Sequence, residues 1–179
     1  VALPPRSPVF SVVCAAEHRI VFVEVQGWMP SEFHAAFVSA LLRTFTSAKD
    51  FIVLDRIYRS DYQVFTGEMG IEEPHLSGIW TAAWESTWSS LLTELTQLQL
   101  PGEPEGFGGP FLRHCSRTKT RCLVAFAMQV GELGPGCVRA YDRLAPVFKQ
   151  LGILSACWEV PDYAAAMRGG RPKPSSLYA

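Results

Sequence analysis

The chain has 179 residues, of which 48% are apolar and 18% are charged, and its formal net charge is -1. This length and composition predict one globular domain with a sizeable core, and the near-zero charge excludes a general electrostatic attraction to nucleic acid or anionic lipid. No apolar run approaches the roughly 20 residues of a membrane-spanning helix, and the first residues have no signal-peptide pattern. We therefore expect a protein of the cytoplasm, with the nucleus as a second location.

Cysteine usage argues against a metal centre. The chain has 5 cysteines, without any C-x-x-C pair. Because several of them lie in apolar runs, we expect buried, reduced thiols: Cys14, Cys115, Cys122, Cys137 and Cys157. A zinc site would need at least three well-spaced ligands, and His114, Cys115 and Cys122 lack a closely spaced second pair. We therefore predict no metal.

The first predicted elements are a hairpin, a helix and a strand. Residues 10–25 hold two β-branched apolar runs separated by the polar residues 17–19, which predicts a β-hairpin. Pro30 and Ser31 form a helix-start signal. The next apolar residues repeat at four-residue spacing and predict an amphipathic helix that lies on the sheet: Phe33, Phe37, Leu41 and Phe45.

The apolar run between Asp50 and Asp55 is typical of a strand that is buried on both faces. The order strand, helix, strand implies a parallel crossover. Glycines and Pro74 interrupt residues 60–78, which predicts a surface loop.

A second long helix is predicted from Ile79 onward. Tryptophan and leucine repeat there at spacings of three and four until the proline- and glycine-rich stretch 101–110: Trp80, Trp84, Trp88, Leu91, Leu95 and Leu98. The three tryptophans on one stripe leave two interpretations open. They pack in the core, or they form a protein-binding face, since aromatic residues are enriched at interface hot spots.

The remaining chain predicts a short helix over 111–118, another buried strand over 122–128 and a third helix over 138–151. Pro146 should kink or restart this third helix, because proline lacks the backbone donor. Residues 158–167 predict one more short element.

The predicted fold class is therefore α/β: a single domain with a mostly parallel sheet flanked by helices and a flexible C-terminal tail. The domain spans residues 1–168. The tail spans residues 169–179, where glycine, proline and serine prevent a contribution to the core.

The sequence contains no catalytic motif. It has no G-x-S-x-G elbow, phosphate-binding loop or H-E-x-x-H pair, and the glycines of 106–109 lack the spacing of a dinucleotide loop. The four histidines are scattered and are interpreted as structural or solvated: His18, His34, His75 and His114. We predict that the chain is not an enzyme and binds no cofactor. The alternative is a small α/β hydrolase or transferase that uses Asp55 or Asp61 near a strand end.

One basic cluster stands out along the chain. It consists of Arg113, Arg117, Lys119 and Arg121 and lacks the interleaved aromatic residues of a nucleic-acid site. We interpret it as a solvated turn or as an edge that meets an acidic partner. Nucleic acid and membranes are not predicted as partners.

The last three residues predict a partner-binding site. Leu177, Tyr178 and Ala179 form a hydrophobic-tyrosine-X sequence, which resembles the tail by which proteasome activators and assembly chaperones dock between α subunits of the core particle. The stretches 51–67, 108–114 and 138–152 resemble, in the same order, segments of the proteasome assembly chaperone 1 family.

This resemblance implies a non-enzymatic chaperone of 20S proteasome assembly. It implies a heterodimer with proteasome assembly chaperone 2 on the α-subunit ring, with the tail in a pocket between α subunits. An exposed apolar face, such as the tryptophan stripe, would form the heterodimer surface. The remaining alternative is an adaptor that another domain recognises through the C-terminus.

Overall fold

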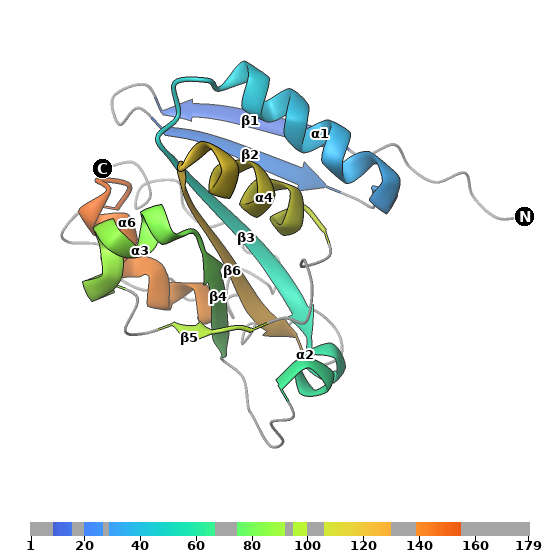
Figure 1. Cartoon of the computed structure of the whole chain (residues 1–179), viewed down its shortest axis with the longest axis vertical. Coiled ribbons are helices and arrows are strands. Elements are labelled where there is room, and N and C mark those ends of the chain that lie inside the picture. The colour runs from blue at the N-terminus through green and yellow to red at the C-terminus, as the bar shows by residue number, and fades with distance from the viewer. Residues whose placement is uncertain are drawn as a thin grey trace, which may run out of the picture.

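The computed structural model of the chain describes residues 9–15, 20–26, 29–66, 75–91, 95–99, 106–129 and 139–154. Within these residues it is a single α/β domain, with a four-stranded sheet, flanking helices and a separate two-stranded hairpin (Figure 1). In the larger sheet β3 pairs with β6 and β4 with β5 in parallel, and only β4 and β6 are antiparallel. The predicted fold class is confirmed.

Strands and helices alternate over much of the chain. The elements are β1 (Val9–Ala15), β2 (Ile20–Gln26), α1 (Ser31–Thr44), β3 (Asp50–Tyr58), α2 (Arg59–Thr66), β4 (Leu76–Trp80), α3 (Ala82–Trp88), the 3-10 helix η2 (Ser89–Leu91), β5 (Thr96–Gln97), α4 (Gly108–Thr118), β6 (Arg121–Gln129), the 3-10 helix η3 (Ala140–Leu144) and α6 (Ala145–Gln150). The larger sheet has the order β3-β6-β4-β5, so β6 is central and β3 forms one edge.

Strand β6 forms the centre of the core because its sequence is apolar along almost its whole length. Every residue from 122 to 129 is buried, as expected for the strand predicted over 122–128. Successive side chains of a strand point to opposite faces. Leu123 therefore joins the apolar cluster on one face of the sheet, and Val124 joins the cluster on the other.

Helices cover both faces of this sheet. Val38 of α1 and Phe111 of α4 belong to the cluster around Val124. Trp84 of α3 and Leu144 of η3 belong to the cluster on the opposite face. No helix in the described part of the chain is long and apolar enough to span a bilayer.

The predicted N-terminal elements are present. The hairpin consists of β1 and β2, which pair antiparallel from Val9↔Gln26 to Ala15↔Ile20. Helix α1 begins at Ser31 directly after Pro30. Its inner face differs from the predicted one, because Val38 is fully buried whereas Phe33 is 55% exposed.

The predicted parallel crossover from the hairpin to residues 50–58 is wrong. Strands β1 and β2 form a sheet of their own, and the parallel partner of β3 is β6. The parallel pairing therefore joins Asp50 to Arg121. Their side chains form a two-point ion pair, with Nε to Oδ1 at 2.5 Å and Nη2 to Oδ2 at 2.7 Å.

The loop predicted over 60–78 is wrong at both of its ends, while its residues 67–74 lie outside the described part of the chain. The long helix predicted from Ile79 is also wrong. Helix α2 occupies 59–66, and strand β4 occupies 76–80. The tryptophan repeat then runs from the end of β4 through the short helix α3, and β5 follows at 96–97. The repeat at three and four thus spans a strand-to-helix junction.

The tryptophan stripe packs in the core. Trp84 is fully buried, and Trp80 and Trp88 are partly buried against the same apolar cluster. Of the two interpretations left open by the sequence, core packing is therefore confirmed, and the stripe does not form an exposed heterodimer face.

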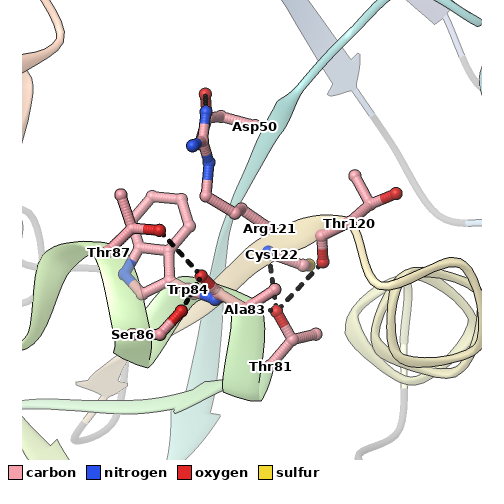
Figure 2. A network of polar contacts seen from close by, with 9 residues as sticks. All are labelled: Asp50, Thr81, Ala83, Trp84, Ser86, Thr87, Thr120, Arg121 and Cys122. Carbon is pink, nitrogen blue, oxygen red and sulfur yellow. Dashed lines mark hydrogen bonds and ion pairs between the residues drawn. The ribbon is translucent and has the colours of Figure 1, made fainter.

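Thr81 holds the strand-to-helix junction together. Its Oγ1 accepts hydrogen bonds from the backbone N–H groups of Trp84 at 3.3 Å and Cys122 at 3.1 Å, and donates to the carbonyl of Thr120 at 3.1 Å (Figure 2). One hydroxyl thus caps α3, as N-cap threonines commonly do. The same hydroxyl also holds the start of β6.

The C-terminal helix is interrupted as predicted. Residues 140–144 form the 3-10 helix η3, and α6 begins directly after it with Pro146 in its first turn. Proline fits there because its missing N–H would have no partner within the helix. The hydroxyl of Tyr141 donates a hydrogen bond to the carbonyl of Asp55, which ties η3 to β3.

Candidate functional site

The tail predicted to bind partners lies outside the described residues, which end at residue 154. Leu177, Tyr178 and Ala179 therefore stay a prediction. The boundary between the domain at 1–168 and the tail at 169–179 lies outside them as well, as does the short element predicted over 158–167.

The structure separates the two candidate catalytic acids. Asp55 lies within β3, which continues to Tyr58, and Asp61 lies in the first turn of α2. The Asp55 carboxylate accepts a 2.8 Å hydrogen bond from the N–H of Arg56. Burial raises the pKa of Asp55 above its ordinary value, although this hydrogen bond and the charges of Arg56 and His34 act in the opposite direction.

His75 belongs to a polar network inside the domain. Its Nε2 lies 3.0 Å from the hydroxyl of Ser77 and 3.2 Å from that of Tyr62. Ser77 is fully buried and Tyr62 is 1% exposed. Because a substrate cannot reach the Ser77 hydroxyl, we assign this network a structural role that joins α2 to β4.

Two of the five cysteines form a thiol pair in the core. Cys115 and Cys122 are both fully buried, and their side chains hydrogen-bond each other. This bond lowers the pKa of Cys115, against the effect of burial, and the same bond and burial raise the pKa of Cys122. Cys14 is exposed, so the prediction of a buried thiol is wrong there. No group of His, Cys, Asp or Glu side chains that could hold a metal ion occurs among the described residues.

The hairpin carries exposed apolar side chains on both of its faces. Val13 and Phe22 are direct cross-strand partners and are 49% and 45% exposed. Val12, on the other face, is 54% exposed. Consecutive apolar residues, such as Val12 and Val13, are typical of a strand that is buried on both faces. This hairpin surface was missed in the sequence.

Among the described residues, one edge of the larger sheet also carries exposed apolar side chains. Strand β3 forms this edge, and its residues Leu54 and Tyr58 are 50% and 48% exposed. An edge strand presents backbone groups that can pair with another chain, and exposed apolar side chains favour such association. The hairpin surface and the β3 edge are thus two exposed apolar features of the described part that suit a protein partner.

The predicted basic cluster is divided among different roles. Arg121 forms the ion pair with Asp50, so it is committed to the sheet. Arg113 and Arg117 line an open groove between α1 and α4. Lys119 ends α4 in the left-handed conformation, with φ of 55°.

The chain matches no protein-family model and no curated protein. Its fold is similar to that of several solved structures. Pyrococcus furiosus PbaB, an archaeal proteasome activator, superposes with a TM-score of 0.60 at 17% identity, over 89% of this chain and 65% of that one. For P. furiosus PbaA, an archaeal homologue of proteasome-assembly chaperone, the TM-score is 0.58 at 15% identity, over 84% of this chain and 61% of that one.

A proteasome-assembly chaperone homologue of Mycobacterium tuberculosis gives a TM-score of 0.52 at 17% identity, over 89% of this chain and 61% of that one. In a second crystal form of PbaA the matched share of that chain is 52%. The chain thus spans about half to two thirds of the length of these structures. At these identities the similarity concerns the fold, and the chain has the fold of the proteasome-assembly chaperone homologues.

Proposed function

We propose that this protein is a non-enzymatic chaperone of 20S proteasome assembly that acts in the cytoplasm, with the nucleus as a second location. The fold shared with PbaA, PbaB and the mycobacterial homologue carries this proposal. The order of the resembling stretches 51–67, 108–114 and 138–152 supports it.

The proposed partners are the α subunits of the proteasome and a second assembly chaperone, in a heterodimer. The hairpin surface and the β3 edge are the proposed contact regions for this second chaperone. Their exposed valine, leucine and aromatic side chains support the assignment, because burial of apolar area is the main favourable term in protein association.

The proposed tail site consists of Leu177, Tyr178 and Ala179, which would enter a pocket between two α subunits. Burial of the leucine and the tyrosine ring contributes about 1.5 to 3 kcal/mol each. Ordering of the backbone costs about 1 to 2 kcal/mol for each residue. Since these terms nearly cancel, the folded domain must supply most of the affinity. A charge-assisted bond between the terminal carboxylate and a basic group of the pocket would give the tethered tail its net favourable contribution, at high effective concentration.

Removal of the tail tests this function. A chain that ends at residue 176 should fold with the same melting temperature as the full chain but bind purified α-subunit rings at least about tenfold more weakly, since about 1.4 kcal/mol corresponds to tenfold. Binding is measured by surface plasmon resonance. The matched control is the full-length Ser176→Ala variant, which keeps all three tail residues.

Equal binding by the full and shortened chains would contradict the tail mechanism but not the chaperone function. Absence of binding by the full chain, alone and together with the second chaperone, would overturn the proposed function itself.

A further inference from the structure

Two buried thiols meet where helix α4 is followed by strand β6. Cys115 lies in the last turn of α4, and Cys122 is the second residue of β6. Both side chains are fully buried in the same apolar cluster, and they hydrogen-bond each other. Their sulfur atoms are therefore in direct contact, so a small movement brings them to the sulfur–sulfur distance of a disulfide, about 2.05 Å.

Backbone bonds hold the two cysteines together without the help of the sulfur atoms. The N–H of Thr120 donates to the carbonyl of Cys115 at 2.9 Å. The N–H of Cys122 donates to Oγ1 of Thr81 at 3.1 Å, at the start of β6 (Figure 2). The thiols thus meet because the backbone places them there.

The end of α4 separates these thiols from solvent on one side. Residues 116–119, which follow Cys115, are exposed. Lys119 ends α4 in the left-handed conformation, with φ of 55°, which is unfavourable for a residue with a side chain. Helix ends open at a lower cost in free energy than helix centres. A small oxidant can therefore reach the pair when the last turn of α4 opens, without unfolding of the whole domain.

The hydrogen bond between the thiols also decides which sulfur reacts first. Cys122 donates and Cys115 accepts, so the bond lowers the pKa of Cys115, against the effect of burial. The same bond and burial raise the pKa of Cys122, which keeps its proton. A thiolate, and not a thiol, is the nucleophile in such reactions. Cys115 is thus the attacking group, and Cys122 is the resolving group.

We propose that Cys115 and Cys122 form a reversible redox switch, in which hydrogen peroxide converts the two thiols to a disulfide that ties the end of α4 to β6. In the first step the Cys115 thiolate bonds one peroxide oxygen and the O–O bond breaks. The other oxygen leaves as hydroxide, which takes up the proton that Cys115 released. In the second step the sulfur of Cys122 bonds that of Cys115, and the hydroxyl group of the sulfenic acid leaves as water with the Cys122 proton.

Two thiols and one peroxide thus give one disulfide and two water molecules. A dithiol reductant reverses the change by thiol–disulfide exchange. The disulfide closes the loop 115–122 in the unfolded chain and so lowers the conformational entropy of that state. We expect the melting temperature of the oxidised protein to exceed that of the reduced protein by about 5 °C. This switch goes beyond the proposed function and does not depend on it.

The test uses the full chain with Cys14→Ser, Cys137→Ser and Cys157→Ser, which leaves the pair as the remaining thiols. The reduced protein is treated with an equimolar amount of hydrogen peroxide, denatured and alkylated, and the monomer is isolated. Trypsin cleaves after arginine and lysine, so peptides 114–117 and 122–139 separate unless a disulfide joins them. We expect mass spectrometry to find the joined peptides. Dithiothreitol should separate them and return the melting temperature to that of the reduced protein.

Two variants in the same background test the geometry. Cys115→Ala removes one thiol. Cys115→Ala combined with Ser116→Cys restores a thiol at the next position, which is exposed. We expect no joined peptides and no rise in melting temperature for either variant, because the remaining thiol cannot reach a partner in the folded protein. Circular dichroism checks their fold, and the measurements on the protein with both cysteines stand even where Cys115→Ala does not fold.

The proposal is overturned if both thiols stay open to alkylation after peroxide treatment, or if Cys115 is oxidised to a sulfinic acid without joined peptides. It is also overturned if the oxidised protein melts at or below the temperature of the reduced protein, or if the thiol moved by Ser116→Cys joins Cys122 equally well. Binding to α-subunit rings enters none of these measurements, so this test and the test of the proposed function fail independently.

Discussion

At the scale of single residues, Thr81 shows how one side chain can bond three backbone groups and join two elements, α3 and β6. Its hydroxyl group bonds the N–H of Cys122, the N–H of Trp84 and the carbonyl of Thr120. Thr81 is 5% exposed, so water cannot replace these bonds. A buried backbone group that loses its partner costs the full free energy of desolvation.

Thr81→Val should lower the free energy of unfolding by about 1 to 3 kcal/mol, because it leaves the N–H of Cys122 without its acceptor. Thr81→Ser keeps the hydroxyl and loses one methyl group, so about 1 kcal/mol or less is expected. Urea denaturation measures both. A loss as large for serine as for valine would show that the methyl contact, and not the hydroxyl group, matters.

Asp55 gives a pH-dependent prediction. Because burial raises its pKa in the folded state, the folded protein holds a proton that the unfolded chain has already lost once the pH exceeds about 4. The free energy of unfolding therefore falls as the pH rises from about 4 through the raised pKa of Asp55. Above that pKa the full loss of stability is present. Asp55→Asn carries no charge and can still accept the bond from Arg56.

The melting temperature of Asp55→Asn should therefore exceed that of the wild type by more at about pH 7 than at about pH 4. Calorimetry across this range measures the difference. A difference that is the same at both pH values would mean that the carboxylate is not destabilised by burial. Asp61→Asn, at an exposed position, is the matched control.

At the scale of elements, helix α4 lies unusually close to β6. A Cβ atom at Gly108 would lie 2.8 Å from Cγ1 of Val124, which is closer than side chains tolerate. The glycine that begins the stretch 108–114 is thus required by this approach, and the same approach brings Cys115 against Cys122.

Gly108→Ala should destabilise the protein by about 1 to 3 kcal/mol through overpacking, which exceeds the gain of up to about 1 kcal/mol from helix propensity. In a Val124→Ala background the same substitution should cost nothing, because the clashing methyl group is gone. A double-mutant cycle by urea denaturation measures this coupling. Equal costs in both backgrounds would place the strain elsewhere.

The elements that the sequence predicted well are those whose pattern is local. The hairpin, the start of α1, β6 and the restart at Pro146 depend on runs, caps and proline chemistry within a few residues. The prediction of one long helix from Ile79 to Leu98 is wrong because Trp80 and Trp84 keep helical spacing across the junction between β4 and α3. That junction lies at Thr81. The predicted parallel crossover from the hairpin is wrong for another reason, since the partner of β3 lies far along the chain and is chosen by tertiary packing.

The candidate sites were predictable to different degrees. The tail was proposed from a three-residue resemblance. Arg113 and Arg117 were visible in the sequence as basic residues, but the groove that they line was not, because it forms only when α1 and α4 pack together. The hairpin surface could have been predicted from the sequence, because consecutive β-branched residues place apolar side chains on both faces of a strand.

At the scale of the whole molecule, polar and apolar surfaces are divided between regions. Arg113 and Arg117 line the groove between α1 and α4, while the hairpin surface and the β3 edge carry exposed apolar side chains. The apolar regions can therefore be altered by mutation without changing the groove.

Val13→Lys should weaken the proposed heterodimer by about 1 to 2 kcal/mol or more, if the face with Phe22 is buried there, and leave the fold intact. Val12→Lys tests the opposite face of the same strand. Analytical ultracentrifugation with the second chaperone measures both. Unchanged association in both variants would exclude the hairpin surface from the interface.

The pairing of Asp50 with Arg121 has a consequence for synthesis. On the ribosome, β3 is made long before its central neighbour β6 has left the exit tunnel. Until then the nascent chain exposes the apolar side chains of β3 and the hairpin, and closing such a distant pairing is slow. The first half of the chain is thus expected to need molecular chaperones until β6 has left the exit tunnel.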